Sequence, residues 1–227
     1  RIIYLILLEI SKGTSKFALY LNLPILTAFA FIISLRSIKS SFKNNNKKKI
    51  LIFEKSHGID DIKQITILKK DDNLNFYLLG RIHLWIIYEY FKTKDLRNKD
   101  KYDFDKKDEE KYLNYINKVF YFFKKIINIE LIISFNARYP GEIIFQNLDK
   151  NLKIKYIVLQ KECLFTESAL LNLKNFFLKR KKFNGDHLTT YNEQYKDMLL
   201  STNFVNKDKI TVIGMNRADK YFSLTNK

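Results

Sequence analysis

Short β-branched runs alternate with segments of helical pattern in the second half of the chain, and this alternation constrains the fold more than any other feature. Runs that are apolar throughout are typical of strands buried on both faces, as in parallel sheets. Strands that alternate with helices form a parallel sheet with helices on its faces. We therefore predict strands at 130–135, 154–159, 187–191 and 209–214, with helices at 140–148, 166–180 and 192–201.

The first half of the chain continues this pattern less regularly. We predict a strand at 48–56, a helix at 80–92 and a second helix at 110–126. The segment 37–46 is a polar helix or loop, and the mixed charges of 93–110 indicate a solvated internal loop. The 110–126 helix has an apolar face at helical spacing, formed by Leu113, Ile116, Val119, Phe120 and Phe123.

The N-terminal segment allows two interpretations. Residues 16–36 approach the length of a membrane span, but they include Asn22, Pro24 and Thr27. We favour a strand at 1–10, a helix at 16–27 capped by Ser15, and a strand at 29–34. Pro24 costs about 3 kcal/mol inside a helix, so that helix would kink or end there. No secretory signal pattern is evident.

Composition excludes several classes of site. A net charge of +17 would favour nucleic acid or an anionic membrane as partner, but the Lys residues are scattered along the chain, as the base composition of an AT-rich genome also produces. The single Cys163 excludes an intrachain disulfide and a cysteine-based zinc site. The three histidines lie far apart, so no metal site is expected. Glycine-rich phosphate loops and the G-x-S-x-G elbow are absent from the sequence.

Together these features predict one α/β domain, a Rossmann-like, mostly parallel sheet with helices on both faces, over 1–222, with 223–227 beginning a linker. Ligands of such sheets bind at the carboxyl ends of the strands. The polar residues that follow the predicted strands are therefore the candidates for a site. They are Glu9, His57, Asn136, Arg138, Lys161, Glu162, Asn192, Glu193, Arg217 and Asp219.

Glu162 and His57 are the candidate catalytic residues. Lys161 and Glu162 stand between apolar residues, and an apolar setting makes a carboxylate a better general base toward a hydroxyl. The alternative is a structural ion pair. His57 precedes Gly58 and is a possible proton shuttle or an ordinary loop residue. Asn192 and Glu193 either bind substrate or only cap the helix that follows.

Three stretches, "IVLQKE", "FNGDHLTTYNEQYKDML" and "NKDKITVIGMNRADKYF", resemble the first domain of GT-B-type transferases of bacterial surface polysaccharide. That group includes the CDP-glycerol glycerophosphotransferases and capsule-type glycosyltransferases, in which a strand followed by G-x-x-R-x-D closes the N-terminal half. The resemblance is best over 130–222 and looser over 1–60. It implies an acceptor-binding half, with the donor held mostly by a second Rossmann-like domain that this chain lacks. The chain is then expected to be a fragment.

The resemblance also implies roles for individual residues. Lys161 and Glu162 match the residues that line the interdomain cleft, where the glycerophosphotransferases have a histidine-glycine motif; its absence favours sugar transfer. Arg217 and Asp219 match G-x-x-R-x-D, with Arg217 suited to bind donor phosphate and Asp219 to hold Arg217 or to cap the next segment.

The expected function is a cytoplasmic, metal-independent glycosyltransferase without a cofactor. It moves a sugar or related group from a nucleotide-activated donor to a glycan or lipid-linked acceptor of a surface polysaccharide. Glu162 or His57 is the general base, and the other candidates bind substrate: Asn136, Arg138, Lys161, Asn192, Glu193, Arg217 and Asp219.

Other functions stay open. One is CDP-glycerol-type transfer of an alditol phosphate. Others are a basic nucleic-acid-binding protein and a membrane-anchored structural protein, although nucleic acid is not expected as a partner. Peripheral contact of the basic surface with the anionic inner face of the plasma membrane is compatible with the transferase hypothesis.

Overall fold

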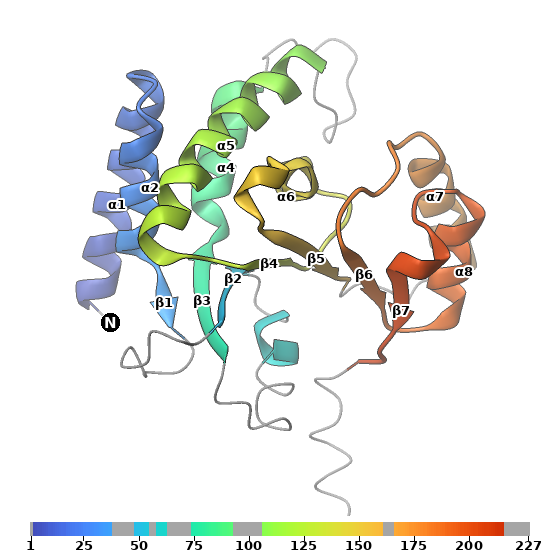
Figure 1. Ribbon diagram of the computed structural model, residues 1–227. Coiled ribbons are helices and arrows are strands. Elements are labelled where there is room, and N and C mark those ends of the chain that lie inside the picture. Colours follow the sequence, from blue (N-terminus) through green and yellow to red (C-terminus); the bar gives the residue numbers. More distant parts are fainter. Residues whose placement is uncertain are drawn as a thin grey trace, which may run out of the picture.

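A computed structural model describes residues 2–37, 48–54, 58–62, 74–92, 106–160 and 166–215 (Figure 1). These residues contain a seven-stranded sheet in the order β1-β3-β2-β4-β5-β6-β7. β1 is antiparallel to β3, and every other pair of neighbours is parallel. The predicted Rossmann-like, mostly parallel α/β fold is therefore confirmed. The strands are β1 Arg36–Ser37, β2 Lys48–Glu54, β3 Leu74–Gly80, β4 Leu131–Ser134, β5 Lys155–Leu159, β6 His187–Thr190 and β7 Ile210–Val212.

Helices connect most of these strands, and residues 58–62 form a short helical segment between β2 and β3. Short 3-10 turns at Ile144–Asn147, Lys150–Leu152 and Lys207–Lys209 complete the connections. The labelled helices are α1 Ile2–Tyr20, α2 Pro24–Ser34, α4 Arg81–Phe91, α5 Lys106–Ile127, α6 Pro140–Ile143, α7 Glu167–Leu178 and α8 Glu193–Ser201.

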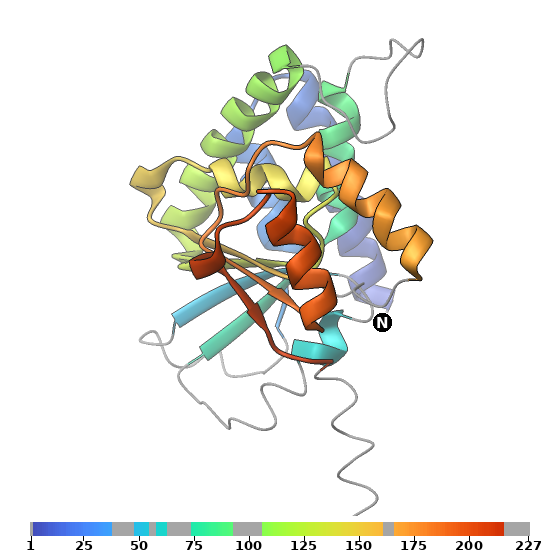
Figure 2. The same ribbon diagram turned by 90° about the vertical axis from the view of Figure 1, so that its right-hand side faces the viewer.

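The direction of each crossover decides which face of the sheet its helix covers. The connections from β3 to β4 and onward to β7 all run one way across the sheet, whereas the connection from β2 to β3 runs the other way. Connections between parallel strands are almost always right-handed, so connections that run in opposite directions cover opposite faces. This rule places α5 and α6 on one face and segment 58–62 on the other. Figure 1 shows this arrangement, and Figure 2 shows α7 and α8 packed side by side along the β6–β7 end.

Two hydrophobic clusters follow from the alternation of side chains along the strands. Leu51 of β2 is paired with Ile132 of β4, and both belong to the large cluster under the helices. The next residues, Ile52 and Ile133, point to the other face and join a smaller cluster that includes Ile62 of segment 58–62. Helices thus lie on both faces, with most of the described helical residues on one of them.

Aromatic side chains fill the large cluster between α2, α5 and the sheet. The rings of Phe120 and Phe123 on α5 lie 6.2 and 6.1 Å from the Phe31 ring on α2. Phe145 contacts both Phe120 and Phe53 of β2. The predicted apolar face of α5 is confirmed, with Leu113 only partly buried and two tyrosines that were not predicted, Tyr112 and Tyr115, also buried.

The two strands predicted in the N-terminal segment were wrong, whereas residues 16–20 and 24–27 of the predicted helix are helical, with the interruption expected near Pro24. Residues 2–10 and 29–34, which lie in the segments predicted as strands, belong to α1 and α2. Ser15 lies inside α1 and caps no helix, and Glu9 follows no strand. Residues 21–23 form a turn between α1 and α2, and Asn22 in this turn has a positive φ of 53°. Pro24 then begins α2, where its missing N–H removes no hydrogen bond. Within the described ranges, no helix is long and apolar enough to cross a bilayer.

Two further segments differ from expectation. β3 was not predicted, although it pairs with β2 along seven residues of register. Residues 106–110, predicted as the end of a charged loop, form the start of α5. There the negative charges of Asp108 and Glu109 interact favourably with the positive end of the helix dipole. The remainder of that predicted loop, 93–105, lies outside the described residues.

His83 of α4 is fully buried beneath α1. Its two ring nitrogens lie 3.4 Å from Ser11 Oγ and 3.5 Å from Ser15 Oγ, and the Phe31 ring is 5.8 Å away. Burial, together with the positive charge of Lys12, lowers the pKa of His83 to about 4. The histidine is therefore neutral in the folded protein at ordinary pH.

We expect this histidine to make the protein less stable in mild acid. Between the unfolded-state pKa of 6.5 and the folded value of about 4, the unfolded chain binds a proton that the folded chain does not. The free energy of unfolding should therefore fall by about 3 kcal/mol as the pH drops through this window. Urea unfolding at a series of pH values measures the loss.

His83→Gln is the matched control because it keeps a polar side chain that does not titrate. The variant should lose clearly less stability over the same pH range than the wild type. If the free energy of unfolding fell equally with pH for both proteins, the acid sensitivity would not come from His83.

Candidate functional site

The topology places a switch point at the carboxyl ends of β2 and β4. From β2 the chain crosses to β3 on one side, whereas β4 and the later strands lie on the other side. Connections that diverge in this way leave a crevice outside the strand ends, where ligands of open α/β sheets bind. The loop 135–139, between β4 and α6, is the described part of the chain at this position.

Asn136 is the most distinctive residue of this loop. It is fully buried, and its Oδ1 accepts a hydrogen bond of 2.6 Å from the backbone N–H of Arg138. Its Nδ2 has no hydrogen-bond partner within the described part of the chain. A buried donor left unsatisfied costs about 1–3 kcal/mol, so such a group requires a partner or a functional explanation.

The neighbouring strand end holds this loop in place. The Ala137 N–H donates to Oε1 of Gln160 at 3.0 Å, and the Gln160 N–H donates to the carbonyl of Thr189 at 3.1 Å. Gln160 is itself fully buried after β5. Backbone and side-chain hydrogen bonds therefore tie together the carboxyl ends of β4, β5 and β6.

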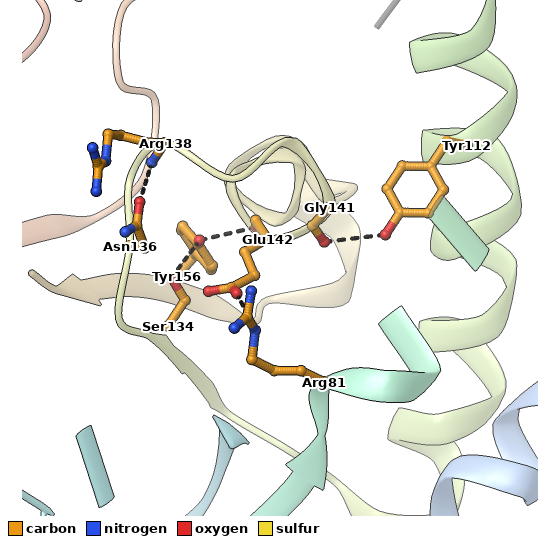
Figure 3. Close-up of polar contacts among 8 residues, drawn as sticks. All are labelled: Arg81, Tyr112, Ser134, Asn136, Arg138, Gly141, Glu142 and Tyr156. Atoms are coloured by element: carbon orange, nitrogen blue, oxygen red, sulfur yellow. Dashed lines mark hydrogen bonds and ion pairs between the residues drawn. The ribbon is translucent and has the colours of Figure 1, made fainter. Parts of the chain in front are cut away.

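An ion pair lies on the other side of the loop. Arg81, the first residue of α4, places Nε 2.6 Å from Oε1 of Glu142 in α6, whose side chain is 4% exposed. The Arg81 guanidinium also lies over the Tyr139 ring at 5.0 Å. Figure 3 shows that Arg138 points away from this pair. Sequence reasoning missed both members, although Arg81 directly follows β3 and Glu142 lies in the first turn of α6.

Two buried tyrosines hold α6 through hydrogen bonds to its backbone carbonyls (Figure 3). Tyr156 of β5 donates to the Glu142 carbonyl at 2.9 Å, and its hydroxyl lies 3.0 Å from Ser134 Oγ. Tyr112 of α5 donates to the Gly141 carbonyl at 3.1 Å. Burial raises the pKa of both Tyr112 and Tyr156 far above neutrality. These hydroxyls therefore act as structural donors that position α6 and the loop before it.

The loop after β6 reaches across the same edge of the sheet. The Tyr191 hydroxyl donates to Oδ2 of Asp61 at 2.8 Å, and Asp61 is 3% exposed in segment 58–62. This hydrogen bond joins residues that follow β2 and β6, two strands that are not neighbours in the sheet.

The structure places the predicted site residues at different positions. Asn136 and Arg138 share the loop after β4. Asn192 caps α8 by accepting from the Tyr195 N–H at 2.8 Å. Glu193 forms an exposed ion pair with Lys196. The structural interpretation of Asn192 and Glu193 thus has direct support. His57, Lys161, Glu162, Arg217 and Asp219 lie outside the described residues and stay predictions.

The loop presents an amide donor and a guanidinium, which suit an oxygen-rich or anionic ligand better than a metal ion. In the described ranges, no group of three or more His, Cys, Asp or Glu side chains could hold a metal. Comparisons with protein-family models, curated proteins and solved structures gave no match.

Gly58 supports the site by close packing. A Cβ at this position would lie 2.5 Å from ring atoms of Phe135, whose side chain is fully buried next to Asn136. We expect Gly58→Ala to lower the free energy of unfolding by about 1–3 kcal/mol, because the ring must move within a packed cluster. Chemical denaturation measures the change.

The matched control is Gly13→Ala in α1, where an added Cβ meets no atom within 4 Å. This change should stabilise the helix by about 0.5–1 kcal/mol. Equal changes in stability for the two variants would contradict the close packing of Gly58 against Phe135.

Proposed function

We propose that this chain is the acceptor-binding domain of a GT-B-type glycosyltransferase. In this proposal it takes part in moving a sugar or related group from a nucleotide-activated donor to a surface polysaccharide acceptor. Two features support the proposal. One is the Rossmann-like sheet with its switch point. The other is the resemblance of 130–222 to such transferases.

The observation that carries the proposal is the unpartnered amide of Asn136. Nδ2 is a donor, buried at the switch point, and without a partner among the described residues. A hydroxyl or phosphate oxygen of a substrate is a suitable acceptor for it. Such a bond discriminates strongly, since a substrate without the oxygen leaves the amide unsatisfied.

The residues of the loop can bind and orient a substrate. The Oδ1 bond to the Arg138 N–H holds the Asn136 side chain in one orientation. The guanidinium of Arg138 suits a phosphate or a polar sugar edge. The general base is assigned from the sequence alone, to Glu162 or His57.

Asn136→Asp tests the role of the amide. An Asp side chain keeps the oxygen that accepts from Arg138 N–H and replaces the Nδ2 donor with a second acceptor. We expect the transfer rate to fall about tenfold or more, the effect of losing one hydrogen bond to substrate. The assay follows nucleotide release from a panel of nucleotide-activated sugars and CDP-glycerol, with the intact gene product and membrane-extracted acceptors.

Asn192→Asp is the matched control, because Asp is as good an N-cap as Asn. It should keep the wild-type rate, and thermal unfolding should show that both variants are folded. If Asn136→Asp unfolds, Asn136→Ser replaces it, since a Ser hydroxyl can accept from the same N–H. Wild-type protein that consumes no donor of the panel would refute the proposed function, and a full rate for a folded Asn136 variant would remove Asn136 from the site.

A further inference from the structure

The hairpin of α1 and α2 distributes its side chains in the opposite way to an ordinary amphipathic hairpin. Its buried positions carry small and hydroxyl side chains, while many large apolar side chains face outward. Most of its fully or nearly fully buried residues are of the small or hydroxyl kind, namely Ser11, Ser15, Ala18, Thr27, Ala28, Ala30 and Ser34.

Hydrogen bonds between helices accompany this small-residue packing. Ser11 Oγ donates to the Ala30 carbonyl at 2.5 Å, which joins α1 to α2. Both Ser11 and Ser15 approach His83 of α4, and Thr27 lies 2.6 Å from the Tyr115 hydroxyl of α5. Close contact through small residues, with hydroxyl and histidine hydrogen bonds, is the mode by which helices associate in lipid.

The outward side of the hairpin is apolar along both helices. Exposed side chains recur at helical spacing, and the exposed fraction reaches 75% for Ile3 and 58% for Phe17. Apolar surfaces that extend over several turns mark sites of interaction with a partner or a membrane. The outer face of the hairpin is formed by Ile3, Ile6, Ile10 and Phe17 of α1 with Ile25, Phe29 and Ile33 of α2.

Charge distinguishes between the candidate occupants of this face. Lys12 and Lys16 are the basic residues of α1, and Lys12 is paired with Glu9 at 2.6 Å. The whole chain carries a net charge of +17. A second copy on a two-fold axis would bring the same lysines and the same net charge against each other. Anionic headgroups would instead complement this positive charge.

The length and the apolar character of the helices bear on the mode of attachment. No helix within the described ranges can cross a bilayer, so the hairpin suits a position in the plane of the interface. Tyr20, 80% exposed at the end of α1, is of the residue type enriched at headgroup depth. We infer that the outer face of the hairpin lies in the interfacial layer of an anionic bilayer. This inference does not depend on the transfer reaction.

Vesicle flotation of the full chain tests the inference. Vesicles of phosphatidylcholine mixed with phosphatidylglycerol should carry the wild-type protein, and phosphatidylcholine alone should carry less of it. Replacing Phe17 and Phe29 together by Gln should lower the partition coefficient about tenfold or more, because two exposed aromatic side chains lose their apolar environment. Lys16→Gln should reduce binding only to the vesicles that contain phosphatidylglycerol.

The matched control replaces Leu171 and Leu178 of α7 by Gln. These residues are 59% and 56% exposed at the opposite end of the sheet (Figure 1). The control variant should bind vesicles like the wild type. Because all four positions are exposed, the variants should melt like the wild type, as circular dichroism would show.

Three results would overturn the inference. In the first, the wild-type protein floats with neither kind of vesicle. In the second, the hairpin variant and the α7 variant lose vesicle binding equally. In the third, light scattering shows that the wild-type protein is a dimer and the hairpin variant a monomer, and neither binds vesicles, which would mean that a second copy covers the face. Absence of donor consumption in the transfer assay would leave the inference untouched.

Discussion

Parallel pairing of β2 with both β3 and β4 is the interaction on which the rest of the structure depends. β2 is buried on both faces, with Leu51 and Phe53 toward the helices and Ile50 and Ile52 toward the smaller cluster. A slip of one residue would exchange these two sets, so both clusters hold the register. The same pairing sets the switch point, because the chain leaves β2 on one side and later returns on the other.

The geometry of the candidate site depends on this arrangement of strands. The carboxyl end of β4 presents Asn136, and the tie from Gln160 after β5 fixes the backbone around it. On the other side, the Arg81–Glu142 ion pair and the two tyrosine hydroxyls hold α6. The Asn136 Nδ2, buried without a partner in the described chain, is thereby positioned by rigid elements, which is the condition for selective binding of a polar ligand.

The N-terminal hairpin obeys a different rule from the rest of the fold. In α5, the large apolar side chains on one face are buried. In α1 and α2 most of the buried positions carry small or hydroxyl residues, although Leu19 and Phe31 are also buried, and many large apolar side chains occupy the outside. Patterns of residues therefore misled the prediction there: a continuous apolar run of this length fits a strand, a buried helix or a membrane segment equally well.

The sequence by itself determined those elements whose signal is local. The strands from β4 to β7, the helices between them and the apolar face of α5 follow from short-range periodicity, and Asn136 and Arg138 were found because they follow a recognisable strand. Tertiary structure decided what depends on distant partners. It made helices of residues 2–10 and 29–34, added β3 beside β2 and brought Arg81 to Glu142. These outcomes depend on contacts between segments far apart in the chain, and no local pattern encodes them.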